Sequence, residues 1–222
     1  MLLALGATIG AGALVGADGW FGLGALGVMA QLKQQIVTAL VYLALAGAIM
    51  SAFRPVSLPP LALRGAESRY FLLAPVVLAL TLAASGLVYA TVSSWTGGAA
   101  SASRQVLSVA TDVKWIGPHA PPSVWIIATL RGTLLAPLFE ELLFRGALLS
   151  WLAGHIPVAA AALVSAALFA AMHGFPVVMP YAFLFGLAAT WLRLRSGSLL
   201  PGLTMHALNS LLFLAAGLEL LR

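Results

Sequence analysis

The chain has 222 residues, of which 62% are hydrophobic and only 8% carry a charge. Soluble domains are about half apolar and about a quarter charged, so this composition excludes a soluble enzyme, a disordered chain and a collagen-like repeat, and it indicates a membrane protein. The chain contains no cysteine, which excludes disulfides, thiolate metal sites and a cysteine nucleophile. The net charge of +5 reflects scarce acids, and the basic residues fall at the ends of apolar runs. We therefore expect the lipid bilayer, and not nucleic acid, as the partner of these charges.

Apolar stretches of about the length of a membrane span, which needs about 20 residues, follow one another along the chain. The first, at 1–31, is either one long tilted helix or a hairpin broken near Asp18. It lacks the basic start of a signal peptide, so we expect it to be retained as a membrane helix. The further predicted spans are 36–53, 71–92, 124–151, 156–174, 177–192 and 199–221. The predicted fold class is therefore all-α, a polytopic transmembrane helix bundle of about seven or eight spans.

Two polar segments separate some of these spans. Segment 54–70 contains prolines and charges and is predicted to be an interfacial loop, whereas segment 93–123 is predicted to lie on the membrane surface. We treat the chain as one integral membrane domain, with N-terminal membrane helices and surface loops in 1–123 and the helices that hold the chemistry in 124–222. Its predicted location is the cell membrane, which it crosses several times. The arginines of 54–70 and of 193–195 are predicted to share one side, slightly favoured as the cytoplasmic side.

Two adjacent acids, Glu140 and Glu141, lie inside the predicted span 124–151. One ionised side chain at the bilayer centre costs about 2.5–3.5 kcal/mol on insertion scales, so such residues are expected to have a function or a partner. Glu141 and Arg145 are four residues apart with the acid first, which is the favourable order for a helical ion pair. Glu140 is rotated by about 100° from Glu141 and lacks that partner. The spacing therefore predicts one structural carboxylate and one free carboxylate.

Pro137 lies shortly before this pair of acids. Proline removes one backbone donor and clashes with the carbonyl four residues earlier, here that of Thr133, so we expect the helix to kink or to restart. After a restart, Glu140 would lie in the first turn of the new helix, where the helix dipole favours a negative charge.

Two histidines also lie in apolar sequence. His173 ends the span 156–174 and shares a helix face with Phe169, four residues before it. His206 is followed at three and four residues by Asn209 and Ser210, so both can lie beside it. Polar groups in lipid must face inward and find one another. We therefore expect these two spans and the one with the paired acids to converge on a single polar site.

A carboxylate, two imidazoles and an amide in an apolar pocket suit water-dependent acyl chemistry. A carboxylate with a neighbouring imidazole can deprotonate a water molecule, while a second imidazole and an amide N–H can stabilise an oxyanion. Other hydrolase signatures are missing: the sequence has no His-Glu-x-x-His zinc motif, no Gly-x-Ser-x-Gly elbow and no paired intramembrane aspartates.

Three motifs in this order resemble those of a known family. They are Glu-Glu-x-x-x-Arg at 140–145, Phe-x-x-x-His at 169–173, and His206 followed by an asparagine. This is similar to the motif set of the CPBP (Abi) family, which contains the type II CAAX prenyl endopeptidases and bacteriocin-processing or self-immunity membrane proteins. The resemblance covers the chain from residue 131 to its end, and the three motifs fall on separate predicted spans.

The resemblance implies a glutamate-dependent intramembrane endopeptidase that cleaves a peptide or protein substrate at the membrane. The implied catalytic residues are Glu140, His173, His206 and Asn209, and the implied supporting residues are Glu141, Arg145, Phe169 and Ser210. By this likeness Glu140 activates the water with His173, and His206 forms the oxyanion site with an amide. The family usually has its asparagine four residues after the histidine, where this chain has Ser210, so Asn209 and Ser210 are alternative donors.

The same residues also fit three alternatives. Glu140, His173 and His206 would make a two-histidine, one-carboxylate zinc shell, and the protein would then be a zinc-dependent membrane peptidase. Apart from such a divalent metal we expect no cofactor. A non-enzymatic alternative is a proton-coupled transporter or receptor that uses Glu140 and His173 as a relay, although no inverted repeat or paired broken helices are visible in the sequence. The last alternative is that the buried polar groups only hold the helices together.

Overall fold

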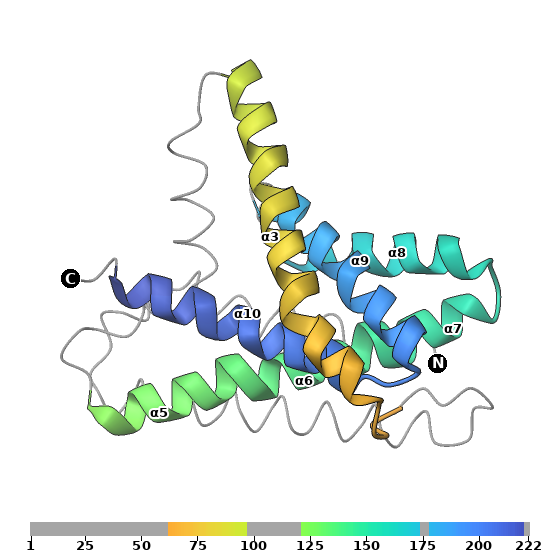
Figure 1. Cartoon of the computed structure of the whole chain (residues 1–222), viewed down its shortest axis with the longest axis horizontal. Coiled ribbons are helices and arrows are strands. Elements are labelled where there is room, and N and C mark those ends of the chain that lie inside the picture. Colours follow the sequence, from red (N-terminus) through yellow and green to blue (C-terminus); the bar gives the residue numbers. More distant parts are fainter. Residues whose placement is uncertain (1–61, 97–120, 174–177, 220–222) are drawn as a thin grey trace.

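The computed structural model describes residues 62–96, 121–173 and 178–219, and every regular element within these ranges is a helix (Figure 1). The all-α fold class is therefore confirmed for this part of the chain. The predicted spans 1–31 and 36–53, and most of the predicted surface segment 93–123, lie outside the described residues.

Helix α3 (Ser68–Thr96) contains the whole predicted span 71–92. Its part Ser68–Thr91 is long and apolar enough to cross a membrane. Two buried hydroxyls on this part bond to carbonyls of their own helix, Thr81 to Val77 and Ser85 to Thr81, as polar groups in a span must do. Residues 62–67 are non-helical, so the predicted loop 54–70 is wrong at its last three residues, where α3 already begins.

The longest helical stretch, Pro122–Ala153, consists of five consecutive segments, and we call it the composite helix. The segments are α5 (Pro122–Leu130), η4 (Arg131–Leu135), α6 (Ala136–Glu140), η5 (Glu141–Leu148) and α7 (Leu149–Ala153), of which η4 and η5 are π-helical. The predicted span 124–151 is therefore confirmed as helix, and it too is long and apolar enough to cross a membrane.

The composite helix passes Pro137 without ending, so the predicted restart is wrong. Shortly before this proline the backbone N–H of Ala136 bonds to the carbonyl of Arg131, five residues back, which is a π turn. A π turn shifts the acceptor by one residue, so the helix can continue through a residue that donates no hydrogen bond. Glu140 consequently lies in the interior of a continuous helix and not in the first turn of a new one.

Three further helices complete the described part: α8 (Val158–Met172), α9 (Met179–Ser196) and α10 (Leu200–Glu219). They lie where the last three spans were predicted. Helix α8 has 15 residues, about 22 Å of helix against the roughly 30 Å of a bilayer core. Two described helices, in α3 and in the composite helix, have the length and hydropathy of a span, so the predicted seven or eight spans are not confirmed.

Helix α9 is the centre of the packing, since it contacts α3, α8 and α10 (Figure 1). The carboxyl end of α3 extends away from the other helices, whereas α10 runs beside the composite helix (Figure 1). At the α8–α9 contact, a Cβ on Gly186 would lie 3.1 Å from the Cα of Ala166. Backbone cannot move aside as a flexible side chain can, so glycine permits this close approach of the two helices.

Replacing Gly186 by alanine should therefore destabilise the protein by about 1–3 kcal/mol, the usual cost of overpacking. Thermal unfolding of the detergent-solubilised protein measures this as a lower Tm. Gly86→Ala in α3 is the matched control, because a Cβ there meets nothing within 4 Å, and it should leave the Tm unchanged or raise it. A Gly186→Ala protein as stable as the wild type would show that α8 and α9 are not in this close contact.

Candidate active site

A buried group of three charged or polar side chains joins η5 to α10. Arg145 Nη1 donates a 2.9 Å hydrogen bond to Glu141 Oε1, and the side chains of both residues are only 1% exposed. The Nδ1 atom of His206 lies 3.1 Å from the same carboxylate oxygen. The predicted pairing of Glu141 with Arg145 is thus present, and the structure adds a second partner that the sequence did not indicate, because His206 lies far away in the chain.

An aromatic ring covers the guanidinium of this group. The Cζ of Arg145 lies 4.2 Å from the ring centroid of Phe169, a cation–π distance. The Phe169 ring is fully buried and also meets the ring of Phe144 edge-on, at 5.2 Å between centroids. The charged pair is therefore held between η5 and α8 by a polar contact on one side and a ring face on the other.

Glu140 approaches the other nitrogen of the same imidazole. Its Oε2 lies 3.6 Å from His206 Nε2, which is beyond hydrogen-bond distance. This oxygen is buried and accepts no hydrogen bond from the described residues. The Glu140 side chain keeps 16% of its surface exposed, against 1% for Glu141. As the helical spacing predicts, the arginine-paired carboxylate is Glu141 and the other carboxylate is Glu140.

His206 lies between two carboxylates, with one near each of its ring nitrogens. Arg145 Nη1 and His206 Nδ1 both lie within hydrogen-bond distance of Glu141 Oε1, and Nδ1 can donate its N–H to this oxygen. The opposite nitrogen, Nε2, then faces an oxygen of Glu140. The imidazole of His206 is therefore placed between the carboxylates of two adjacent residues of the composite helix.

His173 lies at the edge of this group and not in direct contact with Glu140. Among the described residues the two form no ion pair. Nδ1 of His173 lies 2.9 Å from the carbonyl oxygen of Phe169 and donates to it, which leaves Nε2 as an acceptor. The ring of Phe169 lies 4.8 Å from that of His173 and 6.1 Å from that of His206, between centroids. The two histidines that the sequence places together are thus related through one aromatic ring.

Of the two candidate amide or hydroxyl donors, Asn209 is the one in a buried hydrogen bond. Its Oδ1 accepts from the hydroxyl of Tyr181 in α9, which leaves the amide N–H groups for another acceptor. Ser210 is half-buried and makes no hydrogen bond with another described residue. Tyr181 was missed in the sequence, where an aromatic residue near the start of an apolar helix gives no sign of a polar role.

Gly202 is a second residue that sequence reasoning missed. A Cβ at this position would lie 3.1 Å from Glu141 Oε2 and 3.6 Å from the carbonyl oxygen of Ala189. The missing side chain therefore lets α10 approach the carboxylate closely enough for His206, four residues later, to reach it. A glycine after Pro201 at the start of a helix is common for purely local reasons, so the sequence alone carries no signal of this contact.

The residues of the zinc alternative do not form a metal shell in this arrangement. Among the described residues, no group of three histidine, cysteine, aspartate or glutamate side chains is placed to hold a metal ion. The contacts of the two nitrogens of His206 are with the carboxylates of Glu140 and Glu141.

Apolar helices that bury ionisable groups, as the described helices do, are typical of a membrane-embedded protein. Residues 122–212 match the family described as type II CAAX prenyl endopeptidase Rce1-like. This match agrees with the resemblance found in the motifs, and it supports an intramembrane CAAX-type endopeptidase, a class of hydrolase, in general terms. No curated protein and no solved structure matches the chain.

Arg145→Met should destabilise the protein by about 3–5 kcal/mol, because the buried carboxylate of Glu141 would lose its cationic partner. The loss would be measured as a lower yield of membrane-inserted protein and a lower Tm in detergent. The double variant Glu141→Gln with Arg145→Met removes both charges and should recover part of the Tm. An Arg145→Met protein with normal yield and Tm would exclude a structural role for the pair.

Proposed function

We propose that the protein is a glutamate-dependent intramembrane endopeptidase that hydrolyses a peptide bond in a membrane-associated protein or in its C-terminal tail. The observation that supports this most is the position of His206, with one nitrogen on the arginine-paired Glu141 and the other toward the partly exposed Glu140. A structural ion pair alone needs no second, unpaired carboxylate beside the imidazole. The Rce1-like domain favours a peptidase over a transporter or a receptor.

In the proposed reaction Glu140 is the general base. It takes a proton from water together with His173, whose Nε2 is an acceptor. The hydroxide attacks the carbonyl carbon of the substrate, and the negative charge that forms on the carbonyl oxygen is stabilised by donors from Nε2 of His206 and the amide of Asn209. The proton held by Glu140 then passes to the leaving nitrogen as the C–N bond breaks.

In this scheme the remaining residues position the reacting groups. Glu141 holds His206 in one tautomer and orientation, as a second carboxylate does for other catalytic imidazoles. Arg145 is the cationic partner of Glu141, and Phe169 separates and orients the two histidine rings. We further propose that the chain crosses the cell membrane several times and meets its peptide substrate there, with no cofactor.

Glu140→Gln and His173→Ala should each lower the rate of peptide cleavage by about 100-fold or more, since each removes a proton-transfer group. The purified protein would be incubated with a prenylated C-terminal peptide and with an unprenylated membrane-anchored peptide, and the products measured by mass spectrometry. Comparison of the two peptides also tests whether this chain acts on prenylated substrates.

His155→Ala is the matched control for His173→Ala. Nδ1 of His155 lies 2.7 Å from the carbonyl of Trp151, the same contact four residues back, but His155 is exposed between α7 and α8. This variant should cleave both peptides at the wild-type rate. Cleavage that persists at the wild-type rate in both Glu140→Gln and His173→Ala would refute the proposed reaction.

Exhaustive chelation separates the glutamate mechanism from the zinc alternative. Cleavage by the purified protein should continue after dialysis against a strong chelator, because the base in the proposed reaction is a carboxylate and not a metal-bound water. Loss of cleavage that returns on addition of zinc, and not of magnesium, would show that the metal-dependent reaction is the correct one.

A further inference from the structure

The hydrogen bond from Tyr181 to Asn209 joins α9 to α10, and the proposed reaction uses only one of the two side chains. The Tyr181 hydroxyl donates to Oδ1 of Asn209, and the two residues are only 6% and 8% exposed. A carboxamide carries one acceptor oxygen and one NH2 group on separate branches. Because Tyr181 engages the oxygen branch, the NH2 branch is turned away from the hydroxyl.

Aromatic rings on both helices hold the Tyr181 side chain in place. Its ring centroid lies 6.0 Å from that of Phe185 in α9 and 5.6 Å from that of Phe213 in α10. Phe185 also packs against the imidazole of His206, at 4.9 Å between centroids. The rings that hold the tyrosine therefore extend to the imidazole of the candidate active site.

Asn209 lies on the same side of α10 as His206. His206, Asn209 and Phe213 follow one another at three and four residues, which places them along one helix face. Each of them contacts a side chain of α9. Within the part of the chain that the structure describes, the amide N–H groups of Asn209 form no hydrogen bond. One turn from the imidazole there is thus a donor group that is held at its oxygen and is available at its N–H groups.

We propose that Tyr181 is a positioning residue of the oxyanion site, and that its hydroxyl holds the oxygen of Asn209 so that the amide N–H groups face the substrate carbonyl beside His206. This role rests on the proposed peptidase reaction and adds a residue of α9 to it. The last torsion of an asparagine side chain is broad, so an amide without this bond would direct its donors over a wide range. A donor that is already oriented needs no reorganisation when negative charge forms on the carbonyl oxygen.

Tyr181→Phe keeps the aromatic ring and removes only the hydroxyl. We expect kcat for peptide cleavage to fall about tenfold, because a misoriented donor stabilises the transition state less well. KM should keep its wild-type value, since the amide acts when the oxyanion forms and not when the substrate binds. Both constants are measured with the peptides used for Glu140→Gln, and thermal unfolding in detergent checks that the variant is folded.

A double-variant cycle separates positioning from a general structural role. Asn209→Ala removes the donor itself and should lower kcat about 100-fold. In that background Tyr181→Phe should lower kcat no further, because the hydroxyl then has no amide to position. Asn209→Leu, which has a similar volume to asparagine, replaces Asn209→Ala in the cycle if the smaller side chain does not give folded protein.

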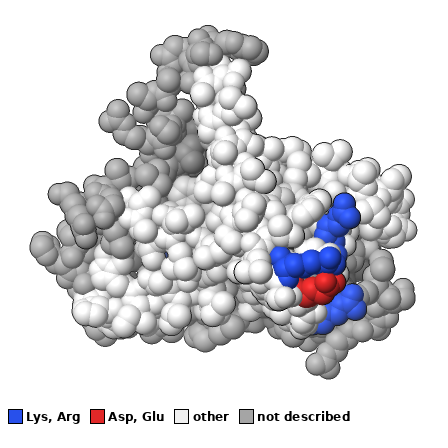
Figure 2. All heavy atoms as spheres, viewed as in Figure 1, with Lys and Arg blue, Asp and Glu red and all other residues white. Residues whose placement is uncertain are grey.

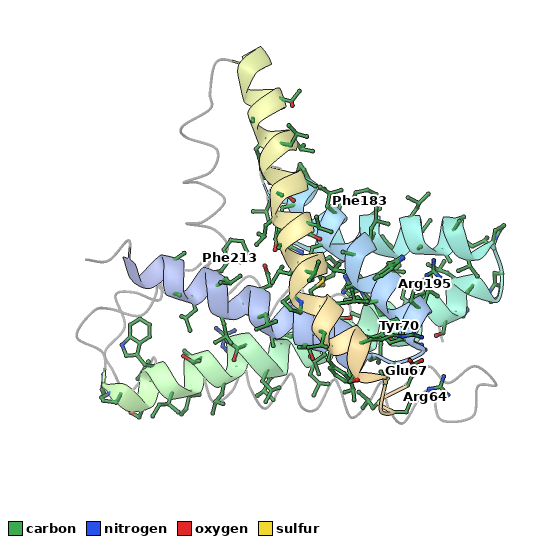
Figure 3. All side chains as sticks on the ribbon, viewed as in Figure 1. Arg64, Glu67, Tyr70, Phe183, Arg195 and Phe213 are labelled. Atoms are coloured by element: carbon green, nitrogen blue, oxygen red, sulfur yellow. The ribbon has the colours of Figure 1, made fainter. Side chains whose placement is uncertain are left out.

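Tyr70→Phe is the matched control. The charged side chains visible in Figure 2 gather at one end of the molecule, and Figure 3 shows Tyr70 beside Glu67 at that end, far from Phe213. Arg64 and Arg195, which the sequence predicted to share one side, lie at the same end (Figure 3). Tyr70→Phe removes the same atom outside the candidate active site, so it should leave kcat and KM unchanged.

The results distinguish this role from the reaction on which it rests. A wild-type kcat in Tyr181→Phe, with Glu140→Gln inactive, would overturn the positioning role and leave the proposed reaction intact. An equal loss of kcat from Tyr181→Phe in the wild-type and Asn209→Ala backgrounds, or a higher KM at unchanged kcat, would overturn it as well. Cleavage by Glu140→Gln at the wild-type rate would instead refute the reaction itself, and the role of Tyr181 with it.

Discussion

A single buried carboxylate, that of Glu141, joins the composite helix to α10. Its oxygen Oε1 accepts from Arg145 within the composite helix and from His206 on α10, in an environment with almost no exposed surface. Buried charges are tolerated only when they are paired and hydrogen-bonded, so both partners must reach the carboxylate. This requirement accounts for the glycine at 202, where any side chain would crowd Glu141, and for the aromatic ring of Phe169 on the guanidinium of Arg145.

The composite helix presents two adjacent carboxylates in two different environments. Glu141 opens a π-helical segment whose residues are all buried, whereas Glu140 closes the preceding α-helical segment and remains partly exposed. π turns are rare and are often found at functional sites, and here one lies on each side of Pro137. The difference between the two acids, one fully buried and one partly exposed, arises from this local geometry together with the position of His206.

The sequence predicted the parts of this site that depend on spacing along one helix, and it did not predict those that depend on contacts between helices. The pairing of Glu141 with Arg145 followed from their separation, and the positions of the last four helices followed from hydropathy. The contacts of His206 with the two acids and the hydrogen bond from Tyr181 to Asn209 join residues on different helices, which no periodicity reveals. Helix α8 begins after Pro157 and ends at the turn of His173, so it is shorter than the apolar run from which the span 156–174 was predicted.

The ring of Phe169 has a further consequence for the two imidazoles. It contacts both, at 4.8 Å from that of His173 and 6.1 Å from that of His206, and it has no ionisable group. Because a benzene ring offers no hydrogen-bonding group, each imidazole must find its hydrogen-bond partner elsewhere: His173 bonds to the backbone carbonyl of Phe169, and His206 bonds to Glu141.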